Sequence, residues 1–231
     1  MTNELHAAGG IVPEEPGRRL VLLRHGRTAW NAEGRAQGHA DVPLDDVGHR
    51  QAAAVAPYVA SLGPAALWTS DLARARETCS YLERATGLEA TSDPRLREFD
   101  VGLRQGLTVA EFEATEPQAH AAWLRGHHAA VPGAEDGAAV RTRMLPALRS
   151  CLDALGAGET GVVVTHGACL KVAVVALLGW PEEIDTSLRG MDNCAWVTLE
   201  ELGLGGRLRL AGYNESVRPG HDAPVRLPDE M

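Results

Sequence analysis

Two histidines that each follow a short apolar run and precede a glycine are the residues of this sequence best suited to chemistry. His25 is followed by Gly26, and His166 is followed by Gly167. A neutral imidazole can attack an electrophile or transfer a proton near neutral pH. The glycine allows a tight turn and lets backbone N–H groups approach a ligand. The two segments are therefore candidate catalytic loops.

Two arginines and one carboxylate occupy comparable positions. Arg24 adjoins the first histidine, while Arg74 and Glu98 follow two further short apolar runs. Arginine presents a planar fork to two oxygens of a phosphate at once and stays charged at any working pH. Taken singly, each residue has an ordinary explanation, as a solvated helix charge or a surface carboxylate. The set indicates function only if the fold gathers it in one place.

The elements that must position these residues alternate between strands and helices. This alternation predicts an α/β fold: a three-layer α/β/α sandwich with a mostly parallel central sheet. In open sheets of this kind the site lies beyond the carboxyl ends of the strands, which is where all the candidates fall. We expect strands at 19–23, 67–70, 88–92 and 161–165, helices at 47–62, 71–86, 108–125, 138–154 and 168–178, and a closing hairpin of 195–199 and 207–210 with Gly205-Gly206 at its turn.

Composition narrows the class of protein. The chain has 231 residues and a formal net charge of -9, which argues against nucleic acid as a partner. No apolar run is long enough to span a membrane. Four scattered cysteines without a CxxC pair predict buried free thiols and a cytoplasmic protein. We expect one domain over residues 18–215, with a flexible N-terminal arm at 1–17 and a flexible C-terminal tail at 216–231.

Several short motifs together resemble the histidine phosphatase superfamily, in its phosphoglycerate mutase-like branch. The similarity covers about residues 19 to 214, and one Arg-His-Gly triplet alone would be weak support. The motifs that carry it are Leu23-Arg24-His25-Gly26-Arg27-Thr28-Ala29-Trp30-Asn31, Gln37-Gly38, Asp41-Val42-Pro43-Leu44, Gly48, Ser70-Asp71-Leu72-Ala73-Arg74-Ala75, Leu96-Arg97-Glu98, Gly106-Leu107-Thr108 and Thr165-His166-Gly167.

The resemblance implies a role for each matching residue. His25 is then the nucleophile that carries the phosphoryl group, and Glu98 is the proton donor and later the base. Charge on the phosphoryl group is held without a metal or other cofactor. The residues implied to bind the phosphate or substrate are Arg24, Arg74, His166, Asn31, Gln37, Thr28 and Gly167.

The reaction outcome and the substrate stay open at this level. The same pocket serves phosphatases and cofactor-dependent phosphoglycerate mutases, and some superfamily members are non-catalytic phosphate-binding modules. We favour a phosphatase, because the segment between Glu98 and His166 is short and carries no lysine. The stretch 190–196 is similar to actinobacterial phosphatases of glucosyl-3-phosphoglycerate, so we expect a sugar or glycerate phosphate as the small-molecule substrate. A homodimer is also expected. The loop 131–136 departs from the superfamily pattern.

Overall fold

The apolar run after Arg19 forms a central strand of a six-stranded sheet. The structure is a computed structural model, and it describes residues 17–203 and 206–217. The strand order is β3-β2-β4-β1-β5-β6. The first four strands in this order run parallel, β5 runs antiparallel to β1, and β6 runs antiparallel to β5. The strands are β1 (Arg19–Arg24), β2 (Ala66–Thr69), β3 (Ala90–Ser92), β4 (Thr160–Thr165), β5 (Trp196–Leu202) and β6 (Arg207–Glu215).

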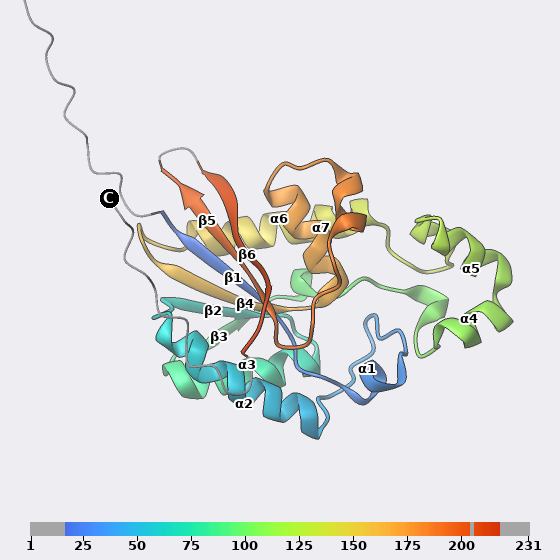
Figure 1. The fold of residues 1–231 in the computed structure, drawn as a ribbon, viewed down its shortest axis with the longest axis horizontal. Coiled ribbons are helices and arrows are strands. Elements are labelled where there is room, and N and C mark those ends of the chain that lie inside the picture. Colours follow the sequence, from blue (N-terminus) through green and yellow to red (C-terminus); the bar gives the residue numbers. More distant parts are fainter. Residues whose placement is uncertain (1–16, 204–205, 218–231) are drawn as a thin grey trace, which may run out of the picture.

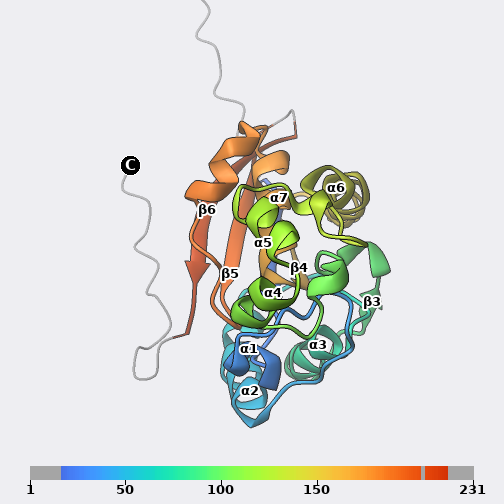
Figure 2. The ribbon, with the colours of Figure 1, turned by 90° about the vertical axis from the view of Figure 1, so that its right-hand side faces the viewer.

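The helices form a layer on each face of the sheet (Figures 1 and 2). Alternate residues of β1 serve the two faces: Leu20 and Leu22 pack with α6 and α7, while Val21 and Leu23 pack with α2 and α3. This alternation follows from the two-residue period of a strand. The helices are α1 (Ala29–Glu33), α2 (Asp46–Ser61), α3 (Ala73–Thr86), α4 (Val109–Thr115), α5 (Pro117–Leu124), α6 (Gly137–Asp153) and α7 (Gly167–Leu177).

The parallel register brings the predicted catalytic loops together. Arg24 at the end of β1 pairs with Thr165 at the end of β4. The next residues, His25 and His166, therefore leave the sheet side by side. Ser70 joins them, because Thr69 of β2 pairs with Val164 of β4. The candidates from three strands thus meet at one edge of the sheet.

The predicted three-layer α/β fold is confirmed, and the helices differ from the prediction in two places. The single helix expected at 108–125 is wrong: Pro117 has no N–H to donate and begins a new helix, so α4 and α5 are separate. These two helices project beyond the strand ends (Figure 1). The short α1 was not predicted. The predicted N-terminal arm up to residue 16, the tail from 218 and Gly205 of the hairpin turn lie outside the described residues.

The four cysteines are free and buried, as predicted. Burial raises the pKa of the Cys79, Cys151 and Cys194 thiols to about 12. No helix within residues 17–203 and 206–217 has the length and hydropathy needed to cross a membrane.

Candidate active site

His25 has the hydrogen bonding of a neutral nucleophile. Its side chain is buried, and Nδ1 lies 2.6 Å from the Gly26 carbonyl oxygen. A carbonyl oxygen can only accept a hydrogen bond, so Nδ1 carries the proton and Nε2 keeps its lone pair. Burial lowers the pKa of His25 well below its ordinary value, and the charges of Arg24 and Arg74 lower it further.

His166 lies beside His25 but is bonded to other protein groups. The two ring centroids are 5.1 Å apart. Arg74 Nε donates to Nδ1 of His166 at 3.1 Å, and the remaining nitrogen, Nε2, donates to Ser70 Oγ at 2.9 Å. Burial lowers the pKa of His166 well below its ordinary value, with Arg74 and His25 adding to the effect. The histidine is therefore neutral here.

Arg74 is a fully buried arginine that reaches the site from α3. Its guanidinium donates to the carbonyl oxygens of Ala40 and Gly38, at 2.7 and 2.8 Å, as well as to His166. These bonds fix its orientation and leave two of its five N–H donors for a ligand. Burial lowers the pKa of Arg74 to about 10, so it stays charged at neutral pH.

Arg24 is held at the opposite side of His25 by backbone. It donates to the Met191 carbonyl oxygen, and its buried Nε has no partner among the described residues. A Cβ at Gly167 would lie 3.2 Å from this nitrogen. The glycine that begins α7 is therefore what allows the guanidinium to pack against that helix.

The Glu98 carboxylate is bonded to the N-terminus of α7. Oε1 accepts from the backbone N–H groups of Phe99 and Cys169, at 2.9 and 2.8 Å. Among the residues that the structure describes, Oε2 accepts from Ala168 N alone, at 2.9 Å. Oε2 therefore keeps one site free for a proton or a substrate oxygen. The positive end of the helix dipole favours a carboxylate at this place.

The backbone around Glu98 is held by two side chains that sequence reasoning left without this role. Arg143 of α6 donates to the carbonyl oxygens of Arg97 and Glu98, at 2.7 and 2.8 Å. His39 Nε2 donates to the same Glu98 carbonyl at 2.8 Å. Arg143 also pairs with Glu135 through two hydrogen bonds. The segment that carries Glu98 is therefore held in a fixed position.

The α1 segment supplies Asn31 to the site and keeps Thr28 away from it. Asn31 Oδ1 accepts from Thr28 N and from Asn193 Nδ2, at 3.2 and 3.3 Å, which turns its amide Nδ2 toward the cavity side. Thr28 is buried as the N-cap of α1 and does not line the cavity. Asn193 Nδ2 also donates to the His25 carbonyl oxygen at 3.1 Å. Sequence reasoning did not identify Asn193, whose partners are remote in sequence.

A cavity of about 330 Å³ opens over these residues. His25, Arg24, Arg74, Glu98, Asn31 and Gln37 line it, whereas His166 and Thr28 do not. Gln37 Oε1 is buried with no partner among the described residues, so a ligand hydroxyl could satisfy it. A second hollow of about 440 Å³ shares Arg24 and Glu98 with the first and is also lined by Gly167. Substrate therefore has two directions in which to extend.

The two buried neutral histidines predict a pH dependence of stability. The unfolded chain binds a proton at each near pH 6.5 while the folded chain does not, so stability falls as pH drops below that value. As the pH drops, each histidine lowers the free energy of unfolding by up to about 1.4 kcal/mol per pH unit. Urea unfolding between pH 6.5 and 5.5 measures this slope. His25→Asn should remove about half of it, and His127→Asn, at an exposed histidine, should not. An unchanged slope in His25→Asn would refute the prediction.

A comparison with known families agrees with this geometry. The model of the histidine phosphatase superfamily, branch 1, matches residues 20–214. That range includes every strand of the sheet except the first residue of β1 and the last residue of β6.

Individual relatives fall into two kinds. The chain is 38% identical over 188 residues to a glucosyl-3-phosphoglycerate phosphatase of Mycolicibacterium vanbaalenii, covering 79% of this chain and 84% of the relative. It is also 38% identical over 178 residues to a probable phosphoglycerate mutase of Yersinia enterocolitica, covering 77% and 82%. A solved mycobacterial glucosyl-3-phosphoglycerate phosphatase in complex with VO₃ has a TM-score of 0.80 and 36% identity, covering 86% of this chain and all of that one.

Proposed function

The chain belongs to the histidine phosphatase superfamily as a phosphatase, and we propose that its substrate is a sugar-linked phosphoglycerate, with glucosyl-3-phosphoglycerate first. One observation carries the proposal of mechanism. Nε2 of His25 keeps its lone pair, and His25 lines a cavity together with the guanidinium groups of Arg24 and Arg74 and the carboxylate of Glu98. The relatives of known substrate support the choice of ester.

In the first step Nε2 of His25 attacks phosphorus and the ester P–O bond breaks. Arg24 and Arg74 bind the equatorial oxygens, whose charge is greatest in the transition state. Their two positive charges take the part that a metal ion plays in other phosphoryl transfers, so we expect activity without a metal. Glu98, protonated on Oε2, gives its proton to the leaving oxygen.

In the second step water hydrolyses the phosphohistidine. Glu98, now a carboxylate, takes a proton from the attacking water, and the N–P bond breaks to release phosphate and restore His25. The hydrogen bond from Nδ1 to the Gly26 carbonyl keeps the imidazole in the same tautomer for the next turnover. His166 acts through Arg74, whose guanidinium it helps to orient.

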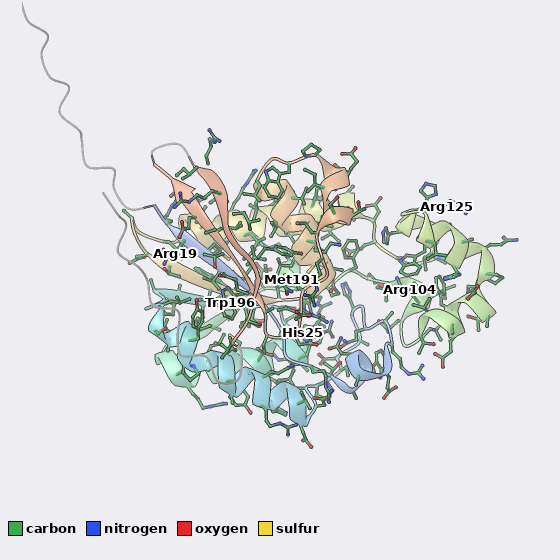
Figure 3. The ribbon with its side chains drawn as sticks, viewed as in Figure 1. Arg19, His25, Arg104, Arg125, Met191 and Trp196 are labelled. Carbon is green, nitrogen blue, oxygen red and sulfur yellow. The ribbon has the colours of Figure 1, made fainter. Side chains whose placement is uncertain are left out.

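The basic residues argue for hydrolysis over mutase chemistry. A mutase must retain a bisphosphorylated intermediate, which calls for several cations beyond those at His25. Of the five arginines between Glu98 and His166, only Arg104 lines the cavity, and Arg149 is exposed. Arg141 pairs with Glu182, Arg143 pairs with Glu135, and Arg125 is exposed beyond the end of α5 (Figure 3). We therefore propose that water accepts the phosphoryl group.

The cytoplasm is the proposed compartment, because four reduced thiols suit a reducing environment. Relatives come from Yersinia as well as from mycobacteria, so an actinobacterial source stays a proposal that rests on the similarity of the stretch 190–196. The homodimer stays a prediction.

Phosphate release from a panel of esters tests the function. With EDTA present, glucosyl-3-phosphoglycerate should give the highest kcat/KM, ahead of 3-phosphoglycerate, sugar phosphates and p-nitrophenyl phosphate. The chelator should leave the rate unchanged, since Arg24 and Arg74 supply the positive charge. Conversion of 3-phosphoglycerate to its 2-isomer faster than phosphate release would replace the phosphatase with a mutase. Release that stops with EDTA would contradict the mechanism.

A further inference from the structure

Arg104 is a cavity-lining cation that the proposed reaction does not use. It ends a short helical turn, Gly102–Arg104, and is partly buried. Figure 3 shows it on the side of His25 that faces α4 and α5. The other arginines of the cavity are accounted for, because Arg35 pairs with Glu111 and with Glu33, and Arg24 and Arg74 flank His25.

Within residues 17–203 and 206–217, the guanidinium group of Arg104 has no carboxylate partner and forms no side-chain hydrogen bond. Burial lowers the pKa of its guanidinium, and no acidic neighbour acts against this. Two acidic residues that line the cavity are engaged elsewhere, since Glu135 pairs with Arg143 and Asp100 Oδ1 accepts from Gly102 N at 2.9 Å. Burying a cation without a partner costs free energy unless a bound ligand supplies the opposite charge.

Aromatic side chains hold the guanidinium in one orientation. Its central carbon lies 4.0 Å from the centroid of the Trp123 ring and 5.6 Å from that of Phe112. Phe112 is fully buried and packs edge-on against Trp123, which fixes the support in turn. A stacked guanidinium keeps its N–H edge available and loses little entropy when it binds an anion.

We infer that Arg104 binds a carboxylate on the alcohol part of the substrate, and so selects phosphate esters that carry a second anionic group. A carboxylate fits better than a second phosphate, because one guanidinium balances one negative charge. Arg104 and Glu98 line the same cavity, so the carboxylate belongs to the leaving group. The inference rests on the proposed phosphatase activity and names the chemistry that distinguishes its substrates.

The competing cation is Lys171, the one lysine of the chain. It lines the second hollow beside Met191, together with Asp185. Its side chain has four rotatable bonds and no aromatic support among the described residues, so it is less pre-organised than Arg104. Arg104 lines the first cavity and Lys171 lines the second hollow, so mutating each residue separately distinguishes their effects.

The test uses two esters that differ only at one carbon: 3-phosphoglycerate, which has the carboxylate, and glycerol 3-phosphate, which has a hydroxymethyl group there. The wild type should prefer 3-phosphoglycerate. Arg104→Met should lower kcat/KM for this ester about 10- to 100-fold, mostly through KM, and change that for glycerol 3-phosphate by less than about threefold. Arg104→Lys should restore part of the preference.

A matched control removes an arginine that stacks on an aromatic ring outside the cavity. Arg84→Met takes away a guanidinium 4.3 Å from the Tyr81 ring and should leave both esters unchanged. Equal losses on both esters in Arg104→Met, no wild-type preference between them, or a loss of preference in Lys171→Met alone would each overturn the inference. All three leave the phosphatase in place, whereas failure to hydrolyse any ester, p-nitrophenyl phosphate included, would overturn the proposed function itself.

Discussion

Replacing His25 with asparagine is expected to lower kcat by on the order of 10⁴- to 10⁶-fold, the range seen when an enzyme loses its nucleophile. Asparagine can still donate to the Gly26 carbonyl, as Nδ1 of the imidazole does, so the turn should keep its shape. What disappears is the lone pair that attacks phosphorus. Phosphate release from p-nitrophenyl phosphate and from the preferred natural ester measures the loss.

Trapping of the intermediate separates this loss from a folding defect. Wild-type enzyme quenched in alkali after mixing with radiolabelled substrate should carry phosphate in an acid-labile N–P bond, and His25→Asn should carry none. His127→Asn, the same exchange at an exposed histidine, should behave as the wild type. A variant at position 25 that keeps a tenth of the activity would remove His25 from the proposed chemistry.

Glu98→Gln is expected to separate the two halves of the reaction. Alkyl esters need a proton on the leaving oxygen, so their turnover should fall about 10²- to 10⁴-fold. p-Nitrophenolate leaves without a proton, and phosphoryl transfer to His25 should persist with this ester. Hydrolysis of the phosphohistidine still needs the base. Rapid mixing should therefore show a burst of p-nitrophenolate close to one equivalent, followed by slow turnover and accumulated phosphoenzyme.

The burst is the decisive readout, because it does not occur if Glu98 acts only on structure. The carboxylate also accepts three backbone N–H groups, two of them from α7, and its replacement could loosen that helix. The unfolding midpoint of the variant should be measured alongside. Equal losses on alkyl and aryl esters, with no burst, would show that Glu98 is not the acid.

The ends of the strands could be predicted from the sequence. The strands that lead to the site are short apolar runs, and the carboxyl ends of parallel strands meet at one edge of the sheet. The runs before His25 and His166 are buried strands as expected, and their pairing follows from the sheet. The break at Pro117 could not be predicted from proline alone, because Pro57 and Pro146 lie inside α2 and α6 without ending those helices. The short α1 could not be predicted either, because it buries none of its residues and so leaves no apolar pattern.

The contacts that orient the site could not be predicted, because they join distant residues to backbone atoms. Arg143 donates to the carbonyl oxygens of Arg97 and Glu98. Every residue has a backbone carbonyl, so the sequence does not show which of them accepts a hydrogen bond. His166 was expected to face the phosphate, but its ring nitrogens are engaged by Arg74 and Ser70. Residue type and position give the set of groups, and only the packed fold gives their partners.

The convergence of remote segments on His25 also bears on how the protein folds. Asn193, which bonds to the His25 carbonyl, is 168 residues away in sequence, and the bond between Arg74 and His166 spans 92. A contiguous fragment that contains the whole cluster must run from Arg24 to Asn193, which is most of the chain. Contacts of such long sequence separation form slowly, because chain entropy is lost before they are made. Catalytic competence should therefore be among the last properties acquired during folding, after helices and local turns are in place.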